Sequence, residues 1–259
     1  MRSSRRRILG QHFLSNPLVL DRLVKYAYLS RSDVVLEVGA GRGELTKRLA
    51  KRAGKVIAVE LDSRFSKPLR ALAEVYPNIE LIVGDVLTVK PTGFNKVVSN
   101  PPYSISKRLI EWLIDSRPEL MVLTLQKEFA SKLVAGPGSS KYLYISVISS
   151  LLYYSRILEI VPKCFFTPRP KVDSAIILMR RRQTAPELKA SWKRFWRMLF
   201  TRRKQTLRRV LDDMLRKNAL DVNVLASLPK QMLSKRVFQL PPDELLTIAE
   251  TLSSCEKPN

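Results

Sequence analysis

Short apolar runs alternate with helix-like segments between residues 33 and 180, and this alternation constrains the fold most. Seven runs are short and rich in branched residues, as strands are, and amphipathic segments separate most of them. Parallel neighbouring strands need such crossover helices, so the pattern predicts an α/β fold with a mostly parallel seven-stranded sheet covered on both faces. Strands are expected at 33–38, 55–60, 79–83, 96–99, 120–125, 157–161 and 174–180.

The helices between these strands, and those that follow them, divide the chain into two predicted domains. We assign residues 1–182 to an α/β domain with a basic N-terminal arm, and residues 183–259 to a small helical domain. The segment Gln183–Pro186 is the predicted linker, and prolines at 229, 241 and 242 interrupt the helical pattern beyond it. Helices are expected at 44–52, 63–75, 105–114, 127–134, 142–152, 187–200, 204–217, 221–227 and 242–252.

The charge of the chain indicates a polyanionic partner. The 46 Lys and Arg residues outnumber the 23 Asp and Glu residues, for a net charge of +23. Residues 180–217 alone hold fourteen basic and three acidic residues. A charge run often marks only a solvated helix face, but the run containing Arg202, Arg203, Lys204 and Arg208 has few acidic neighbours. It therefore predicts contact with phosphates, while the interleaved aromatic side chains are expected in the core.

Several functional classes are excluded by what the sequence lacks. It has no apolar run of about 18 residues and no apolar signal-peptide core, so we expect a cytoplasmic protein without a membrane contact. Cys164 and Cys255 are too few for a disulfide framework or a cysteine-based zinc site. His12 is the single histidine, which excludes a His-rich metal site and any mechanism that needs two histidines. We expect no metal.

Polar and glycine residues follow three successive predicted strands, where an open α/β sheet binds its ligand. The sequence Gly39-Ala40-Gly41-Arg42-Gly43 follows the first strand, and such a turn lets a ligand approach the backbone closely. Alone, the turn also fits a purely structural role. Glu60 ends the second strand, where a carboxylate can accept from both ribose hydroxyls, and Asp85 follows the third, where it can accept from an adenine amine. Two acidic positions favour S-adenosylmethionine over NAD.

The fourth strand is followed by Asn100-Pro101-Pro102-Tyr103, the most informative motif in the chain. An exocyclic adenine amine is a poor nucleophile because its lone pair conjugates into the ring. The Asn100 side-chain oxygen and the Pro101 carbonyl can accept its two N–H bonds and free that lone pair, while the prolines fix both acceptors in place. Tyr103 can stack on the base. A paired base cannot reach such a pocket, so the target must be flipped out or unpaired.

Seven segments occur in an order that resembles one family, the KsgA-type small-subunit ribosomal RNA adenine dimethyltransferases, which are related to the Erm 23S methyltransferases. The resemblance spans about residues 5–215, and its last two segments are more specific to this family than to methyltransferases at large. The segments are GQHFL (10–14), EVGAGRGELT (37–46), VELD (59–62), GD (84–85), NPPYSIS (100–106), LQKEFASKLVAGPGS (125–139) and FFTPRPKVDSA (165–175).

This resemblance implies a Rossmann-like methyltransferase fold and S-adenosylmethionine-dependent dimethylation of two adjacent adenosines near the 3′ end of small-subunit rRNA, within an immature ribosomal particle. It implies that Phe166 stacks on the target adenine together with Tyr103, although a core role also fits that phenylalanine. We expect a monomer that holds RNA with Arg5, Arg6, Arg7, Arg202, Arg203, Lys204 and Arg208. The implied cofactor site consists of His12, Leu14, Gly39, Gly41, Glu60, Leu61, Asp85, Val86 and Asn100.

Two departures from the family pattern leave alternatives open. Pro101 replaces the usual leucine, which moves the motif toward DNA adenine-N6 enzymes and could restrict the second methylation. His12 replaces the usual asparagine, a change without consequence if the contact is through the backbone. The alternative functions are therefore a DNA adenine-N6 methyltransferase and a non-catalytic RNA-binding factor of ribosome assembly.

Overall fold

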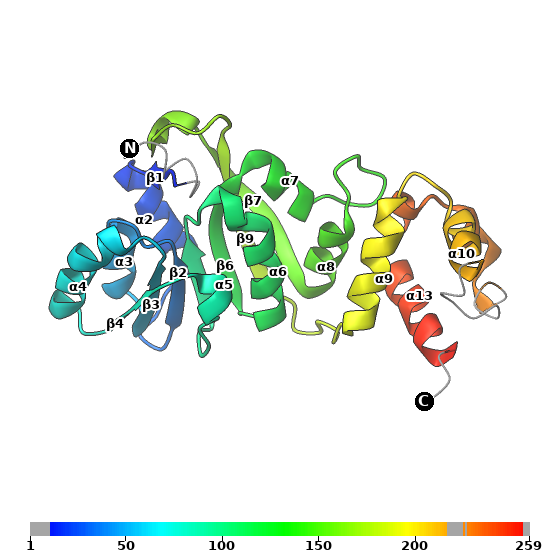
Figure 1. The fold of residues 1–259 in the computed structure, drawn as a ribbon, viewed down its shortest axis with the longest axis horizontal. Coiled ribbons are helices and arrows are strands. Elements are labelled where there is room, and N and C mark those ends of the chain that lie inside the picture. Colours follow the sequence, from blue (N-terminus) through cyan, green and yellow to red (C-terminus); the bar gives the residue numbers. More distant parts are fainter. Residues whose placement is uncertain (1–10, 217–224, 226, 256–259) are drawn as a thin grey trace. The chain divides into compact units, whose positions relative to one another are not determined.

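The computed structural model describes residues 11–216, 225 and 227–255 (Figure 1). The chain forms two compact units: unit 1 is Met1–Ala130 with Tyr154–Arg181, and unit 2 is Ser131–Tyr153 with Arg182–Asn259. Residues 131–153 were expected in the first domain, whereas they group with the C-terminal helices in unit 2. Among the described residues, no helix combines the length and apolar character needed to cross a membrane.

Unit 1 is built on a seven-stranded sheet with the order β4-β3-β2-β5-β6-β9-β7 (Figure 1). Strands β2 to β6 run parallel to one another, and β9 pairs antiparallel with β6. The order reverses between β2 and β5, which creates the crevice at their carboxyl ends where such sheets bind ligands. The strands are β2 (Val34–Val38), β3 (Lys55–Glu60), β4 (Ile79–Val83), β5 (Lys96–Ser99), β6 (Leu120–Gln126), β7 (Tyr153–Val161) and β9 (Ser174–Arg181).

Both faces of this sheet are covered. Val35, Val56 and Val98 point to one face, where they pack with apolar residues of α2 (Pro17–Tyr26), α3 (Glu44–Ala50) and α4 (Ser66–Val75). Their neighbours Leu36, Ile57 and Val97 point to the opposite face and are also fully buried. The fully buried leucines and isoleucines of α6 (Ser106–Ser116), which follows β5, belong to that second layer. The predicted α/β fold is therefore confirmed.

Helix α2 and strands β1 and β8 of unit 1 were not predicted from the sequence. Helix α2 begins at Pro17, and the Asn16 side chain caps it by accepting hydrogen bonds from the backbone amides of Leu18 and Val19. Strands β1 (Phe13–Leu14) and β8 (Phe166–Thr167) form a separate two-stranded antiparallel sheet. This pairing joins the GQHFL and FFTPRPKVDSA segments, which are about 150 residues apart in the sequence.

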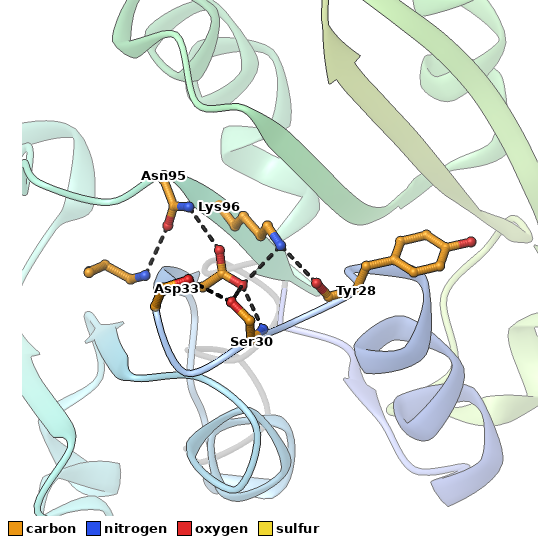
Figure 2. Close-up of polar contacts among 7 residues, drawn as sticks. Tyr28, Ser30, Asp33, Asn95 and Lys96 are labelled. Carbon is orange, nitrogen blue, oxygen red and sulfur yellow. Dashed lines mark hydrogen bonds and ion pairs between the residues drawn. The ribbon is translucent and has the colours of Figure 1, made fainter.

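A buried polar network closes the amino ends of β2 and β5, opposite the ligand-binding end (Figure 2). Asp33 accepts hydrogen bonds from Asn95 Nδ2 at 2.8 Å, from Lys96 Nζ at 2.9 Å and from the Ser30 amide at 2.7 Å. Lys96 also donates to the Tyr28 carbonyl at 2.8 Å. Burial by itself would raise the pKa of Asp33, but the donors lower it to about 2. The network fixes the two central strands relative to each other.

Unit 2 is helical in its described part. The aromatic side chains of α9 form its core: Trp192, Phe195, Trp196 and Phe200 are all buried, as the sequence predicted. Trp196 Nε1 donates to the Leu245 carbonyl at 3.0 Å, which joins α9 to α13. The predicted helix at 221–227 lies almost wholly outside the described residues. The helices are α8 (Tyr144–Leu152), α9 (Ala190–Thr201), α10 (Leu207–Leu215), α12 (Lys230–Ser234) and α13 (Pro242–Cys255), while α7 (Lys127–Leu133) spans the boundary between the units.

Candidate active site

The glycine-rich turn after β2 requires glycine at three positions. Gly39, Gly41 and Gly43 have φ angles of +79°, +55° and +82°. Residues with a side chain rarely adopt such positive values. A Cβ atom on Gly41 would also lie 2.8 Å from the Phe13 ring, so the close approach of β1 demands glycine there. The Gly39 amide donates to the Val59 carbonyl at 2.8 Å, which anchors the turn to β3.

Glu60, the last residue of β3, braces this turn. Its Oε2 accepts from the Gly41 amide at 2.7 Å, and its Oε1 accepts from the Asp62 amide at 2.8 Å. Burial raises the pKa of Glu60, although these amide bonds oppose the shift. Each carboxylate oxygen has two lone pairs, so both oxygens can still accept a further hydrogen bond.

A cavity of about 270 Å³ lies beside Glu60 and brings the predicted adenosine-binding residues together. Glu60, Leu61, Asp85 and Val86 line it, together with Gly39. Asp85 caps α5 (Val86–Val89) by accepting from the Leu87 amide at 2.9 Å, which fixes the direction of its carboxylate. Leu61 is 53 % exposed, so an apolar side chain is available to cover a flat ligand at the rim.

A second cavity, of about 300 Å³, also has Gly39 in its lining. Leu14, Glu37, Asn100 and Thr167 line it, along with the glycine turn. Glu37 Oε2 and Asn100 Oδ1 are buried there without a hydrogen-bond partner. Burial raises the pKa of Glu37 to about 8; the neighbouring Thr46 hydroxyl opposes this shift, and the nearby Glu60 charge adds to it. Unpaired buried polar atoms are costly in a protein interior, so this pair indicates a polar ligand.

The orientation of the Asn100 amide is set by the N-terminal segment. Asn100 Nδ2 donates to the His12 backbone carbonyl at 3.0 Å, so Oδ1 is the atom left to accept. His12 Nδ1 lies 2.7 Å from the Pro168 carbonyl and donates to it, since a carbonyl can only accept. The His12 ring thus holds the β8 segment, while its backbone positions Asn100.

The two predicted aromatic residues occupy different environments. The Tyr103 hydroxyl is hydrogen bonded to the Ser174 hydroxyl, and its ring centroid lies 5.2 Å from that of His12. Burial raises the pKa of Tyr103, so its hydroxyl stays protonated at neutral pH. Phe166 is only 2 % exposed and packs in the core on the α2 side of the sheet. Its predicted stacking on the target base stays a prediction.

The predicted RNA-binding residues that the structure describes divide into two groups. Arg202 forms an ion pair with Asp213, and Arg203 donates to the backbone carbonyls of residues 140 and 142 at 2.8 and 3.1 Å. Lys204 and Arg208, in contrast, are exposed. Arg5, Arg6 and Arg7 lie outside the described residues.

Two polar residues of the site were missed in the sequence. Gln11 lines the cavity beside Glu60, and its Oε1 is buried and unpaired. Glu37 was predicted only as part of the strand that precedes the glycines. A carboxylate inside an apolar strand run was the signal that could have identified it.

The described residues contain no group of three or more His, Cys, Asp or Glu side chains placed to bind a metal. The residues that do converge are a glycine turn, carboxylates at strand ends and an asparagine with a free oxygen. They can bind a nucleoside with an amino-acid-like extension and accept the hydrogen bonds of an exocyclic amine. Independence from a metal stays a prediction.

Comparison with known proteins agrees with this geometry. The family model for ribosomal RNA adenine dimethylase matches residues 2–253. A probable ribosomal RNA small subunit methyltransferase A from Methanosarcina barkeri is 40% identical over 243 residues, covering 92% of this chain and 85% of that protein. The same-named protein from Methanothermobacter thermautotrophicus is 40% identical over 249 residues, covering 95% of this chain and 90% of that protein.

Solved structures show the same relationship. A dimethyladenosine transferase from Plasmodium falciparum has a TM-score of 0.80 and 31% identity, covering 92% of this chain and 96% of that one. The 23S rRNA methyltransferase ErmE has a TM-score of 0.68 and 28% identity, covering 93% and 99%. Family match, relatives and fold agree with the arrangement of the site: the chain belongs to the ribosomal RNA adenine dimethylase family and is an rRNA adenine dimethyltransferase.

Proposed function

We propose that the enzyme uses S-adenosylmethionine to dimethylate N6 of two adjacent adenosines near the 3′ end of small-subunit rRNA, within an immature ribosomal particle. One observation carries the proposal: Asn100 Oδ1 is buried, unpaired and fixed in direction at the rim of the glycine turn. The relatives from Methanosarcina barkeri and Methanothermobacter thermautotrophicus are named as small-subunit rRNA methyltransferases, which supports the choice of subunit.

The residues present fit S-adenosylmethionine. Glu60 is placed to accept from ribose hydroxyls, and Asp85 from the adenine amine, with Leu61 and Val86 against the ring. The turn at Gly39 and Gly41 lets the cofactor approach the backbone, and Leu14 adds an apolar contact. When bound, the cofactor supplies an electrophilic methyl group on a sulfonium.

The protein's part in the transfer is to prepare the adenine amine. Asn100 Oδ1 and the Pro101 carbonyl accept its two N–H bonds, which draws the nitrogen lone pair out of conjugation. The rigid Pro101-Pro102 segment holds both acceptors in place before the substrate enters. Tyr103 stacks on the base, and Phe166 closes the opposite side. Accepting these hydrogen bonds raises the electron density on the nitrogen while both protons are still attached. No strong base is therefore needed before the methyl group is transferred, and one N–H proton leaves afterwards.

The two alternative functions have less support. The matched family model and the ErmE structure are both named for ribosomal RNA, which favours RNA over a DNA acceptor despite the NPPY form of the motif. A non-catalytic assembly factor would have no use for an unpaired Asn100 oxygen beside a cofactor-type cradle. Assembly binding and methylation are compatible in one protein, since an enzyme that modifies a particle must first bind it.

Nucleoside mass spectrometry tests the proposal. Purified protein is incubated with S-adenosylmethionine carrying a deuterated methyl group and with small-subunit particles that lack the modification. We expect labelled dimethyladenosine at two sites per particle, and little on naked rRNA or duplex DNA. Unmodified adenosines would contradict the proposal, and preferred methylation of duplex DNA would favour the alternative.

The same assay tests the role of Pro101. If its ring restricts the second methyl group, monomethyladenosine accumulates, and Pro101→Leu restores dimethylation. Equal yields of dimethyladenosine from both proteins would show that the ring imposes no restriction, because the Pro101 carbonyl is present in either case.

A further inference from the structure

An open groove of about 710 Å³ lies between α2 and α3 in unit 1. Glu44 and Arg48 also line the cavity that contains Asn100, whereas the other lining residues belong to neither of the two active-site cavities. Five cationic side chains and two carboxylates line it, together with Tyr28. The charged residues are Asp21, Lys25, Glu44, Lys47, Arg48, Lys51 and Arg52.

The carboxylates neutralise only one of these cations. Arg48 Nε contacts Asp21 at 2.8 Å, and its Nη1 contacts Glu44 at 3.3 Å, so Arg48 engages both acids. The other four cationic side chains have no ion-pair partner within the part of the chain that the structure describes, and all are exposed. They are Lys25, Lys47, Lys51 and Arg52. An uncompensated cluster of this kind favours an anion such as a nucleic-acid backbone.

Tyr28 adds an aromatic surface to the same groove. Its side chain is 64 % exposed, and its φ of +47° is unusual for a residue other than glycine. Lys96 Nζ holds its carbonyl at 2.8 Å, and Lys96 is itself fixed by Asp33. Figure 2 shows the ring extending away from this network. The buried network therefore maintains an uncommon backbone conformation whose result is an exposed aromatic ring.

We propose that this groove is a second RNA-binding site, in which lysines contact phosphates and Tyr28 stacks on an unpaired base of the same ribosomal particle. The proposal rests on the proposed function, because it names a further contact with the rRNA substrate. Free cations beside an exposed aromatic ring are the combination that single-stranded or looped RNA requires, one for its backbone and the other for a splayed base. An acidic protein surface could pair with the cations, but it would give the exposed Tyr28 ring no role.

The predicted phosphate contacts are tested with Lys47→Gln/Lys51→Gln, which removes one charge from α3 and one from the residue that follows it. Binding to unmodified small-subunit particles is measured over a range of salt concentrations. Two lost phosphate contacts lower the slope of log K against log salt by about 1.5 and weaken binding about tenfold near 0.15 M salt. The matched control is Lys67→Gln/Arg70→Gln on α4, where both side chains are exposed and the same charge is lost.

The stacking half is tested with Tyr28→Asn, since asparagine tolerates the left-handed backbone better than most residues. We expect binding to weaken about tenfold, and Tyr28→Phe to restore it because the ring is kept. Unchanged thermal unfolding and S-adenosylmethionine affinity in each variant show that neither the fold nor the cofactor site is disturbed.

The outcomes separate this inference from the proposed function. If wild type methylates particles but Lys47→Gln/Lys51→Gln and its α4 control bind alike, the groove proposal is overturned and the enzyme assignment stands. A photo-crosslinker at position 51 that labels ribosomal proteins and no rRNA also overturns it in favour of a protein partner. Crosslinked rRNA, with weaker binding specific to the groove variants, supports it.

Discussion

Glu60 Oε2 accepts a hydrogen bond from the Gly41 amide at 2.7 Å, so the carboxylate that ends β3 also holds the glycine turn that follows β2. One side chain thus shapes the cofactor cradle and supplies an acceptor to it. The switch in strand order between β2 and β5 opens the crevice beside this pair.

Replacing Glu60 with glutamine tests this double role. The glutamine side chain has one acceptor oxygen in place of two. Its NH₂ group would therefore face one of the backbone N–H groups that Glu60 now accepts from. Because a hydrogen bond to a charged group contributes about 1.5–3 kcal/mol, we expect S-adenosylmethionine affinity to fall about 10- to 100-fold by calorimetry. Glu80→Gln, which removes half of an exposed ion pair on β4, is the control and should leave affinity unchanged. Wild-type affinity in Glu60→Gln would refute the assignment.

Removing the unpaired acceptor should affect the chemical step. Asn100→Ala deletes Oδ1 and also the bond from Nδ2 to the His12 carbonyl. By analogy with the loss of one pre-organised hydrogen-bonding group in other active sites, we expect the single-turnover methylation rate to fall about 100- to 1000-fold. Particle binding should stay within about twofold. A rate close to wild type would show that Asn100 does not prepare the amine.

The buried Glu37 should make stability depend on pH. Its pKa of about 8 exceeds the ordinary value of 4.5, so the folded protein keeps a proton that the unfolded chain releases between these values. The free energy of unfolding of the cofactor-free wild type should therefore decrease as pH rises from about 5 to 8. In Glu37→Gln this decrease in the free energy of unfolding should be smaller than in wild type, by a few kcal/mol over the same pH range. Urea denaturation at several pH values measures this, and parallel curves for the two proteins would contradict it.

The Asp33 network should show the opposite dependence on pH. Its pKa of about 2 lies below the ordinary 3.8, so the stabilisation is complete above about pH 4 and is lost as pH falls toward 2. Asp33→Asn leaves Lys96 without its buried partner and should cost about 3 kcal/mol at neutral pH. In Asp21→Asn, the loss of an exposed contact to Arg48 should cost less than about 1 kcal/mol. Equal losses in the two variants would show that burial does not strengthen the Asp33 pair.

The C-terminal charge run should separate into structural and RNA-binding residues. Arg203→Gln loses two bonds to backbone carbonyls and should lower thermal stability by an amount equivalent to about 2 kcal/mol. Lys204→Gln/Arg208→Gln should leave thermal stability unchanged but weaken particle binding about tenfold and reduce its salt slope. Lys230→Gln, another exposed cation of unit 2, controls for loss of charge alone. The reverse pattern would place RNA contact at Arg203.

Much of the fold was predictable because its signals are local. The strands expected at 55–60, 79–83 and 96–99 are observed with identical bounds, and the others differ at their ends by a few residues. Apolar runs that fill a doubly covered parallel sheet stand out in sequence, since each must be buried on both faces. Helix α2 was missed because the N-terminal region was interpreted through its charge, although the Asn16-Pro17 start signal was present.

The candidate site was predicted in its parts rather than in its geometry. Residues at strand ends could be named, because parallel strands bring their carboxyl ends to one edge. The role of Gln11 could not be predicted, since its burial depends on packing with segments far away in the sequence. The sequence also could not show which cations of the C-terminal charge run are paired. Arg202 and Arg203 have partners that the fold brings to them, whereas Lys204 and Arg208 are exposed.

The sequence by itself determined the α/β fold, the order of its strands along the chain, the glycine turn and the Asn100 motif, since these depend on local pattern and composition. Only the tertiary structure decided that β1 pairs with β8 across 150 residues, that residues 131–153 join the C-terminal helices, and that Glu37 and Asn100 share one cavity. It also decided which lysine and arginine side chains form ion pairs and which do not. These features arise from long-range packing and burial, which set the partners, the pKa and the exposure of a side chain independently of its neighbours in sequence.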